Sequence, residues 1–126
     1  MIDKVPLVSI VDDDVSVRES LTPLLRHLGY AAEAFSSAEA FLASDRIVET
    51  SCLLLDVTMP GMSGPDLQKE LAHREPSIPI VYITGQGDPT LRLRLLGLGA
   101  VDCLFKPFSE AALIEALGAA LRTGSR

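Results

Sequence analysis

The chain has 126 residues, of which 48% are hydrophobic and 22% are charged, and its formal net charge at pH 7 is -6. A chain of this length can form one domain with its own core, and this composition argues against disorder. The acidic balance argues against direct nucleic-acid binding by this segment, because phosphate contacts need a basic face. No apolar run approaches the roughly 20 residues of a membrane span, and the first residues show no signal-peptide pattern, so we expect a cytoplasmic protein without a membrane partner.

Short apolar runs alternate with segments whose apolar residues recur at helical spacing. This alternation predicts an α/β fold in which helices cover both faces of a parallel sheet. We expect a single domain over residues 1–126, with a core at about 5–121 and a tail or the start of a linker at 122–126. The predicted strands are residues 7–11, 31–35, 52–55, 80–83 and 101–105.

Individual residues predict where the helices begin and end. Gly29 suits the left-handed stop of the first helix, and Ser36 with Glu39 forms a capping-box pattern for a short second helix. Pro65 suits the first turn of the third helix, and Ser109 can cap the fifth.

The fourth helix is expected over residues 91–98. Leu91, Leu95 and Leu98 form one stripe at helical spacing, which we assign to the core. Leu93 then points elsewhere, where an exposed Leu is a usable contact surface. Broader burial of the whole helix is an equally weighted alternative.

Polar groups follow four of the predicted strands directly. Asp12, Asp13 and Asp14 follow the first strand, Asp56 the third, Thr84 the fourth and Lys106 the fifth. The carboxyl ends of parallel strands meet at one edge of the sheet, which is where open α/β sheets bind ligands. Carboxylates, a hydroxyl and a lysine at this edge are the groups needed to hold a divalent cation and to handle a phosphoryl group.

The acidic residues also have simpler readings. A helix N-terminus would explain one Asp, for which Asp14 is the best candidate, but not three adjacent carboxylates that repel one another. Mg²⁺ would relieve that repulsion, so the triplet is also a candidate metal site. Asp56 could merely begin a turn, or it could be a nucleophile that forms an acyl phosphate. The bond between Lys106 and Pro107 is a candidate cis peptide.

These motifs together closely resemble the receiver domain of two-component response regulators, and most of all its FixJ-type branch. The resemblance covers roughly residues 5–121. It implies a doubly wound five-stranded parallel sheet with strand order 2-1-3-4-5 and helices on both faces. It rests on Asp12-Asp13, Asp56-Val57-Thr58-Met59-Pro60 with Gly64, Thr84-Gly85 and Lys106-Pro107-Phe108, in this order.

The resemblance assigns a role to each of these positions. It implies that Asp56 accepts a phosphoryl group from a partner histidine kinase, and that Thr84 and Lys106 contact that group. The implied protein is a signalling switch rather than a conventional enzyme, with dimerisation or an effector domain as its output and transcription as the process it regulates. Thr58 and Gln86 occupy positions that tune the lifetime of the acyl phosphate. The implied ligands of Mg²⁺ are Asp12, Asp13, Asp56 and the backbone carbonyl of Thr58.

One position departs from the family pattern. Cys103 stands where the family usually has an aromatic residue that turns inward on activation, so we expect a void or a neighbour such as Tyr82 to fill that space. On the implied strand order, Cys52 and Cys103 lie two strands apart, about 9.6 Å. A disulfide needs Cα atoms within about 7 Å, so the two cysteines should not pair.

Three alternatives remain open. A phosphatase with an aspartyl-phosphate intermediate would use Asp12 as nucleophile and Asp14 as the acid two residues on, but it leaves Asp56 and Lys106 without roles. A flavin-binding domain is disfavoured because no Ser/Thr/Gly-rich phosphate loop follows the first strand. A pseudo-receiver that acts only through binding is disfavoured by the complete set of acceptor residues.

Overall fold

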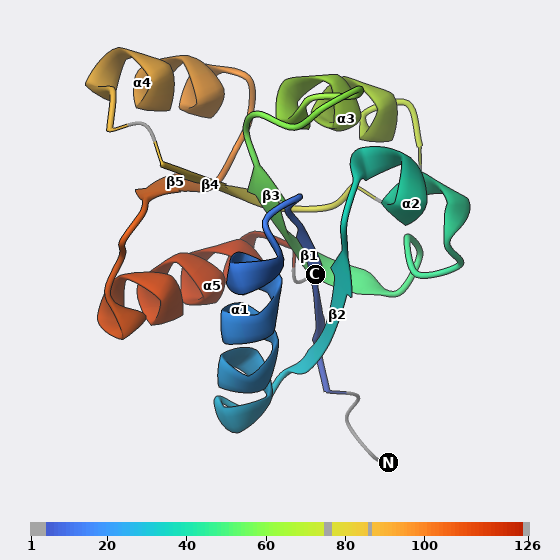
Figure 1. Cartoon of the computed structure of the whole chain (residues 1–126), viewed down its shortest axis with the longest axis vertical. Helices are drawn as coiled ribbons and strands as arrows, with labels where there is room; N and C mark the ends of the chain where they lie inside the picture. The colour runs from blue at the N-terminus through green and yellow to red at the C-terminus, as the bar shows by residue number, and fades with distance from the viewer. Residues whose placement is uncertain (1–4, 75–76, 86, 125–126) are drawn as a thin grey trace.

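The structure is a computed structural model that describes residues 5–74, 77–85 and 87–124. Five parallel strands form one sheet in the order β2-β1-β3-β4-β5, which confirms the expected topology (Figure 1). The elements in chain order are β1 (Leu7–Val11), α1 (Val15–His27), β2 (Ala31–Phe35), α2 (Ala38–Ala43), β3 (Thr50–Asp56), α3 (Gly64–Leu71), β4 (Ile80–Thr84), α4 (Pro89–Gly97), β5 (Asp102–Phe105) and α5 (Glu110–Gly124).

Helices cover both faces of the sheet. In Figure 1, α1 and α5 lie on one side, and α2, α3 and α4 lie on the other. Every residue of β1 and β4 is buried, as expected for parallel strands covered on both faces. The layer under α1 and α5 is built on residues such as Leu25 and Leu117, and the opposite layer contains Phe41, Leu67 and Leu95.

The predicted strands agree with the structure to within two residues at each end. β3 and β4 extend one residue further than expected, so Asp56 and Thr84 are the last residues of their strands. Asp56 and Thr84 are therefore held by the sheet ladder and not by a loop.

The predicted stop of α1 is also confirmed, because Gly29 has φ +100° and its N–H donates to the carbonyl of Arg26.

The predicted capping box of the second helix is wrong by one residue. Ser37, not Ser36, is the N-cap of α2, and its hydroxyl accepts a hydrogen bond from the N–H of Ala40. Glu39 consequently lies one position too early to reach back to the cap, and its carboxylate bonds Met62 instead. A capping box is present at α3, where Ser63 and Asp66 bond each other's backbone and Pro65 lies in the first turn as expected.

The predicted core stripe of α4 holds only in part. Leu95 is fully buried and Leu91 is partly buried, but Leu98 is 50% exposed, so its assignment to the core is wrong. The reason is that α4 ends at Gly97 and the chain turns through Gly99, which brings Ala100 instead of Leu98 into the core. Leu93 is 68% exposed, which confirms its outward direction and excludes broader burial of the helix.

The final helix reaches further than expected. Ser109 caps it as predicted, because its hydroxyl accepts a hydrogen bond from the N–H of Ala112. α5 then runs to Gly124, so residues 122–124 are helical, whereas the sequence assigned them to a tail or linker. Residues 1–4, 125 and 126, on which the expectations for the two ends also bear, lie outside the described residues. Within the described part of the chain, no helix has the length and apolarity needed to cross a membrane.

Candidate functional site

Three carboxylates meet at the carboxyl edge of the sheet. Asp12 follows β1 and Asp56 ends β3, and these two strands are direct neighbours, with Val11 opposite Leu55. One oxygen from each of Asp12, Asp13 and Asp56 lies within 4.8 Å of the others. Asp12 is fully buried, Asp56 is 8% exposed, and Asp13 is open to solvent. The structure therefore brings together the three carboxylates that the sequence nominated as metal ligands.

The loop that carries Asp12 and Asp13 is fixed by its own hydrogen bonds. The N–H of Asp14 donates to Asp12 Oδ1 at 2.9 Å, and Asp14 Oδ1 in turn accepts the N–H of Ser16 at 2.9 Å. Asp14 is thus the N-cap of α1, as expected, and lies outside the acidic group. Arg18 of α1 donates from its guanidinium to the carbonyl of Asp12 at 2.7 Å, a contact that the sequence alone did not indicate.

Burial and neighbouring charge act together on Asp56. Desolvation, followed by the charge of Asp12, raises the pKa of Asp56 to about 7, while Lys106 opposes this shift. A cation at the three carboxylates would reverse the penalty on the ionised form. Carboxylate oxygens are the donors that Mg²⁺ prefers, so the residues present fit this ion.

Lys106 pairs with one member of the acidic group, Asp12. Its Nζ is 3.1 Å from Asp12 Oδ2, and the side chain is 26% exposed. The peptide bond from Lys106 to Pro107 is cis, as the sequence suggested. The backbone N–H of Lys106 also donates to the carbonyl of Thr84 at 2.7 Å, which joins the ends of β4 and β5.

Thr84 is placed at the same edge by the sheet register. Ile83 is opposite Asp56, and the N–H of Val57 donates to the carbonyl of Ile83 at 3.3 Å, so Thr84 comes next along β4 beside the end of β3. Thr84 is 4% exposed. Thr58 is exposed in the loop after Asp56, and Gln86 lies outside the described residues. Asp56, Thr84 and Lys106 therefore come from three adjacent strands to one edge.

Close packing at the start of α3 leaves no room for a side chain at Gly64, which the sequence alone did not indicate. A Cβ atom at this position would lie 2.5 Å from the carbonyl oxygen of Asp56 and 2.9 Å from Cε1 of Tyr82. The N–H of Gly64 donates to the carbonyl of Val57 at 2.9 Å. Gly64 thus allows the start of α3 to pack directly onto the backbone at the end of β3, where Asp56 lies.

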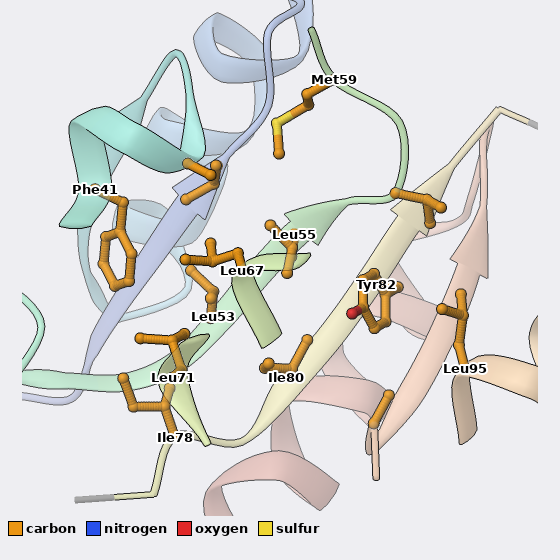
Figure 2. Close-up of a cluster of buried hydrophobic side chains, with 14 of the residues drawn as sticks. Phe41, Leu53, Leu55, Met59, Leu67, Leu71, Ile78, Ile80, Tyr82 and Leu95 are labelled. Atoms are coloured by element: carbon orange, nitrogen blue, oxygen red, sulfur yellow. The ribbon is translucent and has the colours of Figure 1, made fainter. Parts of the chain in front are cut away.

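Cys103, which stands at the position of the family's usual aromatic residue, lies beside Tyr82; that Tyr82 fills the space of the missing ring stays a prediction. Cys103 is buried, and Tyr82 lies opposite it on β4 in the same hydrophobic cluster. Figure 2 shows Tyr82 within this cluster. The Tyr82 hydroxyl donates to Gln68 Oε1 at 2.6 Å, and Gln68 Nε2 donates to the carbonyl of Leu98 at 3.1 Å. This chain of bonds links β4 through α3 to the end of α4. Cys52 and Cys103 are both free, as predicted.

Residues 8–118 match the family model described as the response regulator receiver domain. The chain belongs to the response regulator receiver family. It is 48% identical over 114 residues to nodulation protein W of Bradyrhizobium diazoefficiens, a match that covers 90% of this chain and 50% of that protein. It is 44% identical over 114 residues to the transcriptional regulatory protein FixJ of Azorhizobium caulinodans, covering 90% of this chain and 54% of that protein.

Among solved structures, the crystal structure titled FixJ-N superposes with a TM-score of 0.84 and 40% sequence identity, covering 97% of this chain and 96% of that one. The chain spans about half the length of nodulation protein W and of the FixJ of Azorhizobium caulinodans, 50% and 54%. The family match decides against the phosphatase and the flavin-binding domain. Receiver domains are signalling phosphoacceptors of two-component systems, which bind Mg²⁺ in an acidic pocket and work with histidine kinases.

Proposed function

We propose that this receiver accepts a phosphoryl group on Asp56 from a partner histidine kinase in a Mg²⁺-dependent reaction. The observation that carries the proposal is the position of Asp56 itself. It is buried, it lies beside Asp12 and Asp13, and Lys106 forms an ion pair with Asp12. A carboxylate in this position can attack phosphorus if the surrounding negative charge is neutralised.

Each side chain then has a distinct role. An oxygen of Asp56 attacks the phosphorus of the phosphohistidine, so that a P–O bond forms as the P–N bond breaks and the histidine nitrogen keeps the electron pair. Lys106 is the cation that can move from Asp12 to the transferred oxygens, and Thr84 supplies a hydroxyl at the same edge. Asp12, Asp13, Asp56 and the backbone carbonyl of Thr58 would hold Mg²⁺, which would neutralise the charge that gathers on the phosphoryl oxygens.

Phosphorylation by a small phosphodonor tests the assignment of Asp56. In the presence of Mg²⁺ and acetyl phosphate, the wild-type protein should gain one phosphoryl group that is stable in acid and lost in base, as measured by intact mass. Asp56→Asn should gain none, because the amide is not a nucleophile toward phosphorus. The same chemistry should allow slow intrinsic dephosphorylation of the wild type.

Asp14→Asn is the matched control. It removes a neighbouring charge but keeps an N-cap side chain, since Asn caps helices as well as Asp. This variant should be labelled to the wild-type extent. Stoichiometric labelling of Asp56→Asn would overturn the assignment, and the pseudo-receiver reading would gain if the wild type remained unlabelled.

The output is the second part of the proposal. We propose that the output is phosphorylation-dependent homodimerisation or control of an effector domain that acts in transcription. The transcription role is supported by the name of the relative FixJ, a transcriptional regulatory protein. Because Cys103 has no ring, we expect the signal to pass through Thr84 and the backbone at the ends of β4 and β5, which are joined by the Lys106 N–H. A cytoplasmic location remains a prediction.

Leu93 tests whether α4 takes part in this output. Its side chain is 68% exposed, so Leu93→Asp should leave folding and phosphorylation unchanged but weaken self-association or partner binding of the phosphorylated protein at least fivefold. Sedimentation velocity measures the self-association. The control is Val48→Asp, because Val48 is 71% exposed and lies before the amino end of β3. Equal behaviour of the two variants would remove α4 from the output surface.

A further inference from the structure

Glu39 links α2 to the loop that follows β3. The sequence pattern predicts that this side chain caps the start of its own helix, but its Oε2 accepts the N–H of Met62 at 3.1 Å, 23 residues further along the chain. Glu39 is exposed to solvent and belongs to none of the carboxylates grouped around Asp56. The site described above gives this contact no role.

The linked loop, residues 57–63, begins directly after Asp56 and contains Thr58. Its two ends are fixed by backbone bonds and by the capping box of α3, in which Ser63 and Asp66 take part. Between them, Met59 is 6% exposed and belongs to the same cluster as Phe41 of α2 (Figure 2). α2 therefore contacts this loop through the carboxylate of Glu39, and Met59 buries the loop in the same core cluster that contains Phe41.

The carboxylate of Glu39 lies directly against the loop backbone. Gly61 has φ +77°, a conformation that L side chains rarely adopt, and a Cβ atom there would lie 2.8 Å from Glu39 Oε2. The turn at Gly61 thus presents the next N–H, that of Met62, to the carboxylate at close range. A carboxylate that accepts a backbone N–H forms one of the stronger hydrogen bonds, so this contact restricts the path of the loop.

We infer that Glu39 is a positioning residue for the proposed phosphotransfer: by holding the N–H of Met62 it sets the path of residues 57–63, and with it the position of the Thr58 carbonyl relative to Asp12, Asp13 and Asp56. The inference rests on the proposed function, because only a Mg²⁺-dependent site makes the position of that carbonyl matter. Groups that orient a ligand from outside the coordination sphere commonly change metal affinity by roughly 10- to 100-fold. Because the Glu39 contact is exposed and acts on one ligand through the backbone, we expect the lower end of that range.

The experiment compares Glu39→Ala with Glu39→Gln in calorimetric titrations with Mg²⁺. Glu39→Ala should bind Mg²⁺ roughly tenfold more weakly than the wild type. Glu39→Gln should recover most of this loss, because the amide oxygen still accepts the N–H of Met62 although the charge is gone. Hydrogen exchange of the Met62 amide should become faster in Glu39→Ala and stay close to wild type in Glu39→Gln, whether or not Mg²⁺ is added.

Two further variants make each outcome decisive. Glu115→Ala removes an exposed carboxylate from α5 and should leave the Mg²⁺ affinity unchanged, whereas Asp13→Ala should weaken it strongly. Wild-type affinity in Glu39→Ala together with reduced affinity in Asp13→Ala would overturn the role of Glu39 but leave the proposed function intact. Equal losses in Glu39→Ala and Glu39→Gln would also overturn it, because charge alone would then explain the effect. Undiminished affinity in Asp13→Ala would instead contradict the metal site and the function that depends on it.

Discussion

Asp56→Asn is expected to stabilise the metal-free protein at pH 8 by about 1–2 kcal/mol. In the folded state the pKa of Asp56 is raised from 3.8 to about 7, so the folded protein holds this proton more tightly than the unfolded chain does. The stabilisation from the protonated group is complete below about pH 4 and is lost as the pH rises through about 7. A full shift of this size would be worth more, but the adjacent Asp13 is open to water, which reduces the cost of the ionised form.

Urea denaturation in the presence of a chelator measures this effect. The difference between Asp56→Asn and the wild type should be near zero at about pH 3.5 and should grow up to about pH 8. Asp88→Asn is the control, because Asp88 is an exposed N-cap of α4 and Asn retains the cap. Its effect should not depend on pH in this way. A pH-independent difference for Asp56→Asn would mean that the folded state does not raise the pKa of this carboxyl group.

Gly64→Ala is expected to destabilise the protein by about 2–3 kcal/mol, which is typical of overpacking at a site that cannot relax. The added methyl group would lie 2.5 Å from the carbonyl oxygen of Asp56, 2.9 Å from the Tyr82 ring and 3.2 Å from Cα of Val57. Two of these three neighbours are backbone atoms of the strand and loop that carry the site. We therefore expect a lower midpoint in urea denaturation and slower labelling by acetyl phosphate.

Gly97→Ala is the matched control for this substitution. Gly97 is also a helical residue, but a Cβ atom there would meet nothing within 4 Å. Replacing it should be neutral or stabilising by about 0.5–1 kcal/mol, because Ala loses less conformational entropy on folding. If Gly64→Ala and Gly97→Ala had the same effect on the free energy of unfolding, the close packing of α3 onto β3 would be refuted.

The sequence alone predicted the strands and the edge at which they end. Short strand-like segments bounded by turn residues are a local pattern, so β1 and β2 were predicted with their observed bounds, and β3 and β4 to within two residues. The rule that parallel strands end at one edge then predicted that Asp12, Asp56 and Lys106 would meet, although Asp12 and Lys106 are 94 residues apart. The strand order itself came from the family resemblance and not from the residues.

Errors arose where neighbouring positions offered equivalent local signals. Ser36 and Ser37 are both competent caps, and only the backbone path decides that Ser37 begins α2. Leu98 fits the helical spacing of Leu91 and Leu95 in the sequence. The helix nevertheless ends one residue before Leu98, whose side chain is half exposed. A periodicity predicts which face a residue shares, but it does not predict where the helix stops against its neighbours.

The sequence by itself thus determined the fold class and which acidic residues lie at the carboxyl edge of the sheet, because both follow from local pattern and strand polarity. Only the tertiary structure decided the raised pKa of Asp56, the bond from Glu39 to Met62 and the fit of Gly64 against the carbonyl of Asp56. Each of these depends on the distance between segments that meet only after the helices pack on the sheet. Such distances depend on how whole helices and strands pack, so they cannot be predicted from a short segment of sequence.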